Sequence, residues 1–408
     1  MHRPLRVLLF STLYPSSVLP SHGIFVQTRL RHLLASGAVD VRVVAPVPWF
    51  PSRHPRFGEY ANFAATPLRE ERFGIDVRHP RFVRLPRIGM TSAPLTLAAC
   101  GVAAARQVQA EGFDFDLIDA HYFYPDGVAA TIMGKVLGKP VTITARGTDI
   151  NLIPQHHLPR LMILRAAAAS GHMITVCRAL KDAMVELGAA EQKITVLRNG
   201  VDLQLFRPEA RDAARARLGP GGFHLASVGH LIERKGHHHA IDALPALPDA
   251  VLHVAGSGPE DTALRARARA LGVADRVHFL GGVSQDALRS LYNGVDALVL
   301  ASSREGWANV LLEAMACGTP VAAFPVEGPR EVLGAHEGAK PQGGVLDEDL
   351  LQACQQALRV PRHEARQRAM HFTWETAAEQ FVDHLVPANG FVTSKKVVTK
   401  PVTPLSSE

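Results

Sequence analysis

Two glutamates with seven residues between them, Glu305 and Glu313, bracket a short loop that leads into a helix. The first amides of a helix lack backbone partners, and together with the helix dipole they attract a diphosphate. A carboxylate accepts hydrogen bonds from two adjacent hydroxyls, as in ribose or a hexose. The stretch therefore indicates a nucleotide-sugar site, and we expect its diphosphate to be lined by Gly306, Trp307, Ala308, Asn309 and Val310.

The alternative for this stretch is a solvated helix with two surface glutamates. That alternative does not explain the order of loop, helix and apolar strand in EGWANVLLEAMACGTPV, residues 305–321. It also leaves the apolar helix face unexplained, which consists of Val310, Leu311, Ala314 and Met315. We therefore favour the binding site.

A basic pair follows another apolar strand, in SVGHLIERKG at 227–236. The strand ends at Gly229, and a helix opens near Lys235. Cations at a helix start oppose the helix dipole, so Arg234 and Lys235 need another reason to be there. A diphosphate beyond the end of the strand is such a reason, and two exposed surface cations are the alternative.

In the first half, several polar residues come directly after predicted strands. The carboxyl ends of these strands would face a cleft. His121 comes after the strand 116–119, and Arg146 and Asp149 follow the next strand. Gly23 opens a helix and would leave its amides free. We expect these residues to line one cleft, with a histidine satisfied within the core as the alternative for His121.

The two glutamates, together with CGTPV at 317–321, resemble the E-x7-E signature of retaining glycosyltransferases of the GT-B fold. These enzymes form family four, the glycosyl transferases group 1, which includes bacterial cell-surface polysaccharide glycosyltransferases. The similarity covers the chain to about residue 386. It implies two Rossmann-like domains that face a cleft, and transfer of a sugar from a nucleotide-diphosphate donor without a metal or other cofactor.

The resemblance also implies roles in donor binding and catalysis. Glu305 would hold the sugar hydroxyls and Glu313 the ribose hydroxyls. Lys235 with Arg234 would offset the charge that develops on the leaving diphosphate. The family usually has an arginine where this chain has His230, so the second cation is either Arg234 or a protonated His230.

In the first half, the resemblance assigns His121 to a catalytic contact with the transferred sugar near its reacting end. Gly23 would let the backbone approach the donor. Arg146 and Asp149 would bind the acceptor or support the cleft.

Apolar β-rich runs and amphipathic helices alternate twice along the chain, which is typical of parallel sheets covered on both faces. We expect an α/β fold of two doubly wound domains, with ligands beyond the carboxyl ends of the strands. We predict an N-terminal acceptor-binding domain at 1–200 and a nucleotide-sugar domain at 201–371. A helix that crosses back to the first domain is predicted at 372–388, and a disordered tail at 389–408. Thr373 is the expected N-cap of the crossing helix.

Composition narrows the class of protein. The 408 residues are 47% hydrophobic and 20% charged, which fits a globular protein of two or three domains. The four cysteines lie far apart, which fits a reducing compartment, and we expect a cytoplasmic protein with no transmembrane span. Metal binding by the run 237–239 is not expected, because three consecutive helical histidines point about 100° apart. The missing G-x-G-x-x-G fingerprint excludes a nicotinamide dehydrogenase.

The positive charge is concentrated in the first half. Residues 1–200 carry 23 Lys+Arg against 14 Asp+Glu, whereas the rest carries 21 against 24. Eight arginines lie between residues 53 and 87. Such a surface attracts an anionic acceptor or anionic lipid headgroups at the inner face of a membrane, with ordinary solubilising charge as the alternative. Nucleic acid is not an expected partner, because no recognition motif accompanies the charge.

The leading interpretation is a retaining, metal-independent glycosyltransferase that acts on a glycan, lipid-linked or small-molecule acceptor. In the resembled family UDP is the commonest donor nucleotide and GDP the next. The alternatives are a sugar-nucleotide epimerase of the same fold and a non-catalytic scaffold. A scaffold predicts loss of Glu305, Glu313 or Lys235, and all three are present. The sequence does not identify the sugar, the acceptor or the linkage.

Overall fold

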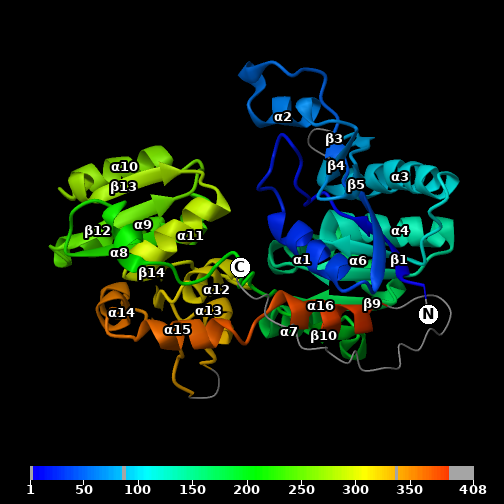
Figure 1. Cartoon of the computed structure of the whole chain (residues 1–408). Helices are drawn as coiled ribbons and strands as arrows, with labels where there is room; N and C mark the ends of the chain where they lie inside the picture. The colour runs from blue at the N-terminus through cyan, green and yellow to red at the C-terminus, as the bar shows by residue number, and fades with distance from the viewer. Residues whose placement is uncertain (1–2, 85–88, 336–338, 386–408) are drawn as a thin grey trace, which may run out of the picture.

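The structure is a computed structural model that describes residues 3–84, 89–335 and 339–385. It has two α/β lobes, each built on its own sheet (Figure 1). This confirms the expected fold class. The tail predicted at 389–408 and the last residues of the segment 372–388 lie outside the described residues.

The first sheet has eight strands in the order β10-β9-β8-β7-β1-β2-β5-β4, parallel except where β4 meets β5. The central strands β7 and β8 are buried along their whole length, as expected for a parallel sheet covered on both faces. The bounds in chain order are β1 Leu5–Phe10, β2 Val39–Val44, β4 Arg69–Arg72, β5 Ile75–Arg78, β7 Leu117–His121, β8 Val141–Ala145, β9 His172–Thr175 and β10 Ile194–Val196. Two further strands, β3 Val47–Pro48 and β6 Arg81–Phe82, pair with each other.

Seven α-helices of the described residues alternate with the strands of this lobe along the chain. They are α1 Ile24–Ala35, α2 Glu59–Ala65, α3 Gly89–Ala110, α4 Val128–Leu137, α5 Thr148–Asn151, α6 His157–Ala169 and α7 Arg178–Leu187. Parallel neighbours need such crossovers, so the carboxyl ends of β1, β7 and β8 meet at one edge of the sheet.

The second sheet is parallel throughout, in the order β13-β12-β11-β14-β15-β16. Its strands are β11 Phe223–Val228, β12 Ala250–Ala255, β13 Val277–Gly281, β14 Ala297–Leu300, β15 Val321–Ala323 and β16 Gly344–Leu346. The order reverses between β11 and β14, which are neighbours although two strands separate them in the chain. Ligands of open α/β sheets bind beyond the carboxyl ends of the strands at such a switch point.

The helices of the second lobe are α8 Arg211–Ala216, α9 His237–Ala243, α10 Asp261–Ala270, α11 Gln285–Gly294, α12 Asn309–Ala316, α13 Glu327–Leu333, α14 Leu350–Ala357 and α15 Arg362–Ala369. Ser284 caps α11 by accepting a hydrogen bond from the amide of Ala287. Of the helices in the described residues, none is both long and apolar enough to cross a bilayer.

The last helix, α16 Trp374–Asp383, lies against the first lobe (Figure 1). Phe381 is buried there in an apolar cluster with residues of β1 and α1, and Thr373 caps the helix as predicted. The two segments that pass between the lobes run side by side, because the amide of Val201 donates to the carbonyl of Phe372 at 2.8 Å.

Candidate active site

The loops after β11 and β14 bring together residues that are far apart in the chain. Gly236 closes the first loop in a left-handed conformation, φ 69°, and a Cβ there would lie 1.9 Å from the carbonyl oxygen of Ala301. Only glycine allows this approach. As a result, Nζ of Lys235 lies 2.5 Å from Oε1 of Glu305.

Glu305 is held by several donors on one oxygen. Oε1 also accepts a hydrogen bond from Ser302 at 2.8 Å and lies 3.8 Å from Nη1 of Arg234. The side chain of Glu305 is only 8% exposed. No described residue donates to Oε2, so this oxygen remains available to a hydroxyl of a ligand. The structure thus brings together the predicted carboxylate and both predicted cations. His230 lies exposed in the same loop.

The loop from Glu305 leads into α12, whose N-cap is Ala308. The amide of Leu311 donates to the carbonyl of Ala308, but the amides of Trp307, Ala308, Asn309 and Val310 have no acceptor among the described residues. These four groups are therefore available to an anion.

The Trp307 side chain is packed inside the protein. Its ring packs edge-on against Phe372 at 5.3 Å and is buried. Arg198 lies 6.0 Å from the ring centre. Hence the indole of Trp307 fixes this loop to the segments that connect the lobes, while its amide has no acceptor among the described residues.

Glu313 lies about one turn into α12 and is partly buried. It accepts a hydrogen bond from the hydroxyl of the fully buried Tyr292 at 3.2 Å. Burial raises the pKa of Glu313 to about 7, and the Tyr292 hydrogen bond lowers the pKa by less. Two ribose hydroxyls would favour the ionised carboxylate, because they donate to it.

The first lobe places His121 differently from the prediction. The residue ends β7 at the expected edge, but its side chain is 1% exposed, so the expectation of a ring open to the cleft is wrong. Nε2 is 2.9 Å from the Asp119 carboxylate, and Nδ1 is 2.6 Å from Nη2 of Arg146. Arg29 also contacts the ring. Burial lowers the pKa of His121 to about 3; the charge of Asp119 raises this pKa, and the charge of Arg29 lowers it further. The imidazole is therefore neutral, and it positions the Arg146 side chain.

Arg146 reaches from the first lobe towards α12 through a chain of side-chain contacts. Nη1 of Arg146 donates to Oδ1 of Asn199 at 3.2 Å, and Nδ2 of Asn199 donates to Oδ1 of Asn309 at 3.3 Å. Asn309 is the first residue of α12. This chain of contacts couples the edge of the first sheet to the predicted diphosphate site.

Asp149 supports a loop and does not line a surface. Its buried carboxylate accepts hydrogen bonds from the amides of Phe123, Arg146 and Gly147 at 2.6, 3.1 and 2.7 Å. Burial raises the pKa of Asp149, and these three amides oppose the shift. Two roles were predicted for Asp149, binding of the acceptor and support of the cleft. The geometry favours support of the cleft.

Gly23 precedes α1 with φ 68°, and a Cβ there would lie 2.4 Å from the carbonyl carbon of Leu13. The loop after β1 thus folds back onto the start of α1, which only glycine permits. A cavity of about 370 Å³ lies beside this loop, and its lining includes Thr12, Tyr14, His22 and Tyr122. Because Thr12 follows β1 and Tyr122 follows β7, the cavity lies at the carboxyl ends of the first sheet.

Four residues near the site are missing from the sequence prediction. Arg29 and Asp119 hold His121, Tyr292 holds Glu313, and Glu331 joins the lobes by accepting from Nε of Arg198 at 2.8 Å. Asp119 stands two residues before His121 at the end of an apolar strand, which is a readable signal. The others come from helix interiors, where no local pattern distinguishes them.

No group of three His, Cys, Asp or Glu residues that could hold a metal occurs in the described part of the chain. In the run 237–239, His237 is buried and bonds to Ser227 at 2.8 Å.

Both halves of the chain match known protein families. Residues 23–205 match Glycosyltransferase Family 4, and residues 211–369 match Glycosyl transferases group 1. The chain is 28% identical over 341 residues to TuaC of Bacillus subtilis, named as a teichuronic acid biosynthesis glycosyltransferase, covering 82% of this chain and 84% of that protein. It is 29% identical over 415 residues to glycogen synthase of Mycobacterium tuberculosis, covering 92% of each.

Solved structures share the architecture. HepE of Anabaena in complex with UDP-glucose has a TM-score of 0.68 and 20% identity, covering 93% of this chain and 98% of that chain. Sucrose-phosphate synthase of Thermosynechococcus elongatus has a TM-score of 0.71 and 19% identity, covering 93% and 97%. The two lobes, the two family matches and these neighbours agree. The chain belongs to the group 1 and family 4 glycosyltransferases of the GT-B fold.

Proposed function

We propose that this glycosyltransferase uses a UDP-sugar, or failing that a GDP-sugar, retains the anomeric configuration and needs no divalent cation. The observation that carries the proposal is the Lys235–Glu305 pair next to the unpaired amides of 307–310. Fixed cations and helix amides together can neutralise a diphosphate. The complex of HepE with UDP-glucose supports a UDP donor.

The donor would lie across the loops after β11 and β14. Glu313 would hold the ribose and Oε2 of Glu305 the sugar. Lys235, Arg234 and the α12 amides would stabilise the leaving diphosphate, so catalysis would rest on electrostatic preorganisation and alignment. A direct catalytic contact of His121 is not part of the proposal, because its ring is buried.

The acceptor would bind from the first lobe, in the cavity beside Gly23. We propose a glycan or lipid-linked acceptor of polysaccharide biosynthesis and a cytoplasmic location. The similarity to TuaC supports this acceptor class.

A thermal-shift experiment with UDP and GDP, each with and without EDTA, tests the donor and the metal independence. We expect UDP to stabilise the protein equally with and without EDTA, and Glu313→Ala to abolish the shift. Stabilisation only with added Mg²⁺ or Mn²⁺ would refute metal independence. The anomeric configuration of the product, determined by NMR, tests retention.

A further inference from the structure

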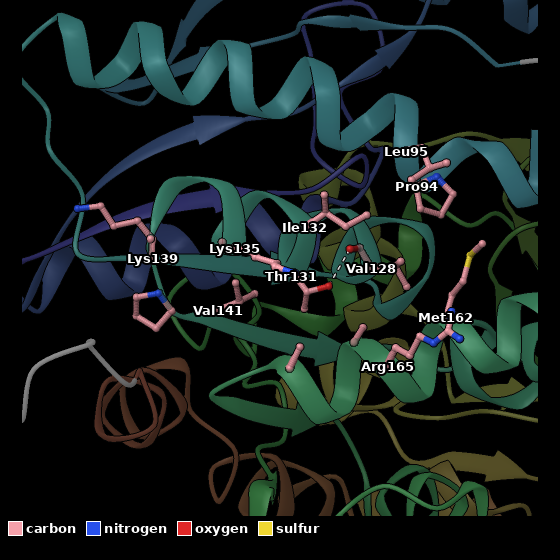
Figure 2. A pocket seen from close by; sticks show the side chains of 15 residues that line it. Pro94, Leu95, Val128, Thr131, Ile132, Lys135, Lys139, Val141, Met162 and Arg165 are labelled. Atoms are coloured by element: carbon pink, nitrogen blue, oxygen red, sulfur yellow. Dashed lines mark hydrogen bonds between the residues drawn. The ribbon is translucent and has the colours of Figure 1, made fainter.

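A groove opens on the flank of the first lobe, away from the donor loops. It is a cavity of about 730 Å³ between α3, α4 and α6. Figure 2 shows Ile132 and Val141 along it, Leu95 and Met162 at one end and Lys139 at the other. Most of its lining is apolar, so it is poorly suited to a free sugar or nucleotide.

The three helices around the groove contain no Asp or Glu. Lys135 and Arg165 line the groove, are exposed, and pair with no described acidic residue. Lys139 is paired with Asp114 at 2.8 Å. The two unpaired cations therefore stand beside apolar side chains without a neighbouring negative charge on these helices.

Large apolar side chains are also exposed on these helices. Leu95 on α3 is 60% exposed, Leu158 on α6 is 55% exposed, and Val136 on α4 is 53% exposed. Leu158, Met162 and Arg165 follow at helical spacing and share one face of α6. Apolar side chains mixed with cations, without acids, form the kind of face that lies in a membrane interface.

Some of the arginines between 53 and 87 are held by partners within the first lobe. Arg69 and Arg78 pair with Asp76 and Glu111. Arg81 donates to the carbonyl of Thr66. The charge of Arg69 and Arg78 is therefore paired within the lobe. Arg53, Arg56 and Arg84 are exposed without a described ion pair, so the attraction of this segment to headgroups stays a prediction.

We propose that the face of α3, α4 and α6 docks on a bilayer that contains anionic phospholipids. Leu95 and Leu158 insert among the acyl chains, and Lys135 and Arg165 meet the phosphates. The proposal is independent of the donor and of the reaction.

Co-sedimentation of the full chain with vesicles tests this face. We expect binding to phosphatidylcholine vesicles that contain phosphatidylglycerol, weakening with salt, and little binding to pure phosphatidylcholine. The double variant Lys135→Glu/Arg165→Glu should partition at least about tenfold less. The matched control is Arg269→Glu/Arg359→Glu, two exposed arginines of the second lobe without a described ion pair, and it should bind like the wild type.

A second variant, Leu95→Ser/Leu158→Ser, removes the apolar part and should lower binding at all salt concentrations. The proposal is overturned if the wild-type protein does not sediment with the vesicles. It is also overturned if the control variant loses as much vesicle binding as the double variant Lys135→Glu/Arg165→Glu. Self-association that disappears in the leucine variant would assign the face to a second copy of the chain instead. If UDP stabilises every variant, the variants are folded. If UDP does not stabilise the wild-type protein but the protein still binds vesicles, only the proposed donor is refuted.

Discussion

Lys235 and Glu305 form an ion pair across 70 positions of sequence, with 2.5 Å between Nζ and Oε1. The pair joins the loop after β11 to the loop after β14. An ammonium has three donors, and Glu305 engages one of them. No described residue accepts a hydrogen bond from the other two, so they are available to a ligand.

Replacing Lys235 tests whether this charge serves the leaving group. Lys235→Met should lower kcat about 10²- to 10³-fold, in the range found when one fixed donor to a developing charge is removed. Steady-state kinetics with the UDP-sugar measure it. Arg265→Met, which breaks the exposed pair with Asp261, is the control and should leave kcat unchanged. A normal kcat in Lys235→Met would remove the lysine from catalysis.

Glu313 should make nucleotide binding depend on pH. Because burial raises its pKa from 4.5 to about 7, and ribose hydroxyls favour the ionised form, UDP affinity should rise between about pH 6 and pH 8. Calorimetric titration should show proton release on binding near pH 7. Glu313→Gln should bind weakly with no such dependence, and a pH-dependent affinity that persists in it would point to another group.

The raised pKa of Glu313 has the opposite effect on the stability of the protein without ligand, which should fall as pH rises. A folded pKa above the unfolded value contributes stability that is complete below pH 4.5 and is lost as pH rises through 7. Glu313→Gln should therefore stabilise the free protein at about pH 8 by roughly 2 kcal/mol. Urea unfolding measures it. A destabilised variant at that pH would show that the ionised carboxylate has a partner in the free protein.

Gly23 should tolerate no side chain. Gly23→Ala adds a Cβ 2.4 Å from the carbonyl carbon of Leu13 at φ 68°, whereas Gly37→Ala adds one at φ 69° with nothing within 4 Å. Gly37→Ala should cost about 1 kcal/mol for the backbone conformation alone, and Gly23→Ala at least about 2 kcal/mol more. Chemical denaturation compares them. Equal costs would mean that the loop after β1 yields easily.

The pair His224–His253 should weaken the fold in acid. His224 Nδ1 and His253 Nε2 lie 2.8 Å apart, and both residues are buried. Burial, reinforced by His224, lowers the pKa of His253 from 6.5 to about 4. A lowered histidine pKa contributes stability above pH 6.5 that is lost as pH falls through 4, here about 2 kcal/mol. The variant His253→Gln should lose less stability as the pH falls. The control His278→Gln, which changes the exposed neighbour, should lose as much stability as the wild type.

The periodicity of the sequence predicts most of the regular elements. Apolar runs predict strands at 6–12, 41–47 and 116–119, and amphipathic spacing predicts a helix at 24–35. The structure has β1, β2, β7 and α1 in these places. The antiparallel strands β4 and β5 were not predicted, because REER and IDVR carry as many charges as a surface loop. Helix α6 was also missed, since its exposed leucines blur the amphipathic pattern.

The sequence by itself determined the fold class and the family, because these depend on local patterns: a helix start, two glutamates at fixed spacing and a basic pair after a strand. The same patterns predict a donor site in the loops after β11 and β14. The tertiary structure decided which side chains are open to a ligand. His121 and Glu305 both stand at carboxyl ends of their sheets, but Arg29 and Arg146 enclose the first, whereas one oxygen of the second remains unpaired among the described residues. Burial depends on elements far away in the chain, and no local pattern records it.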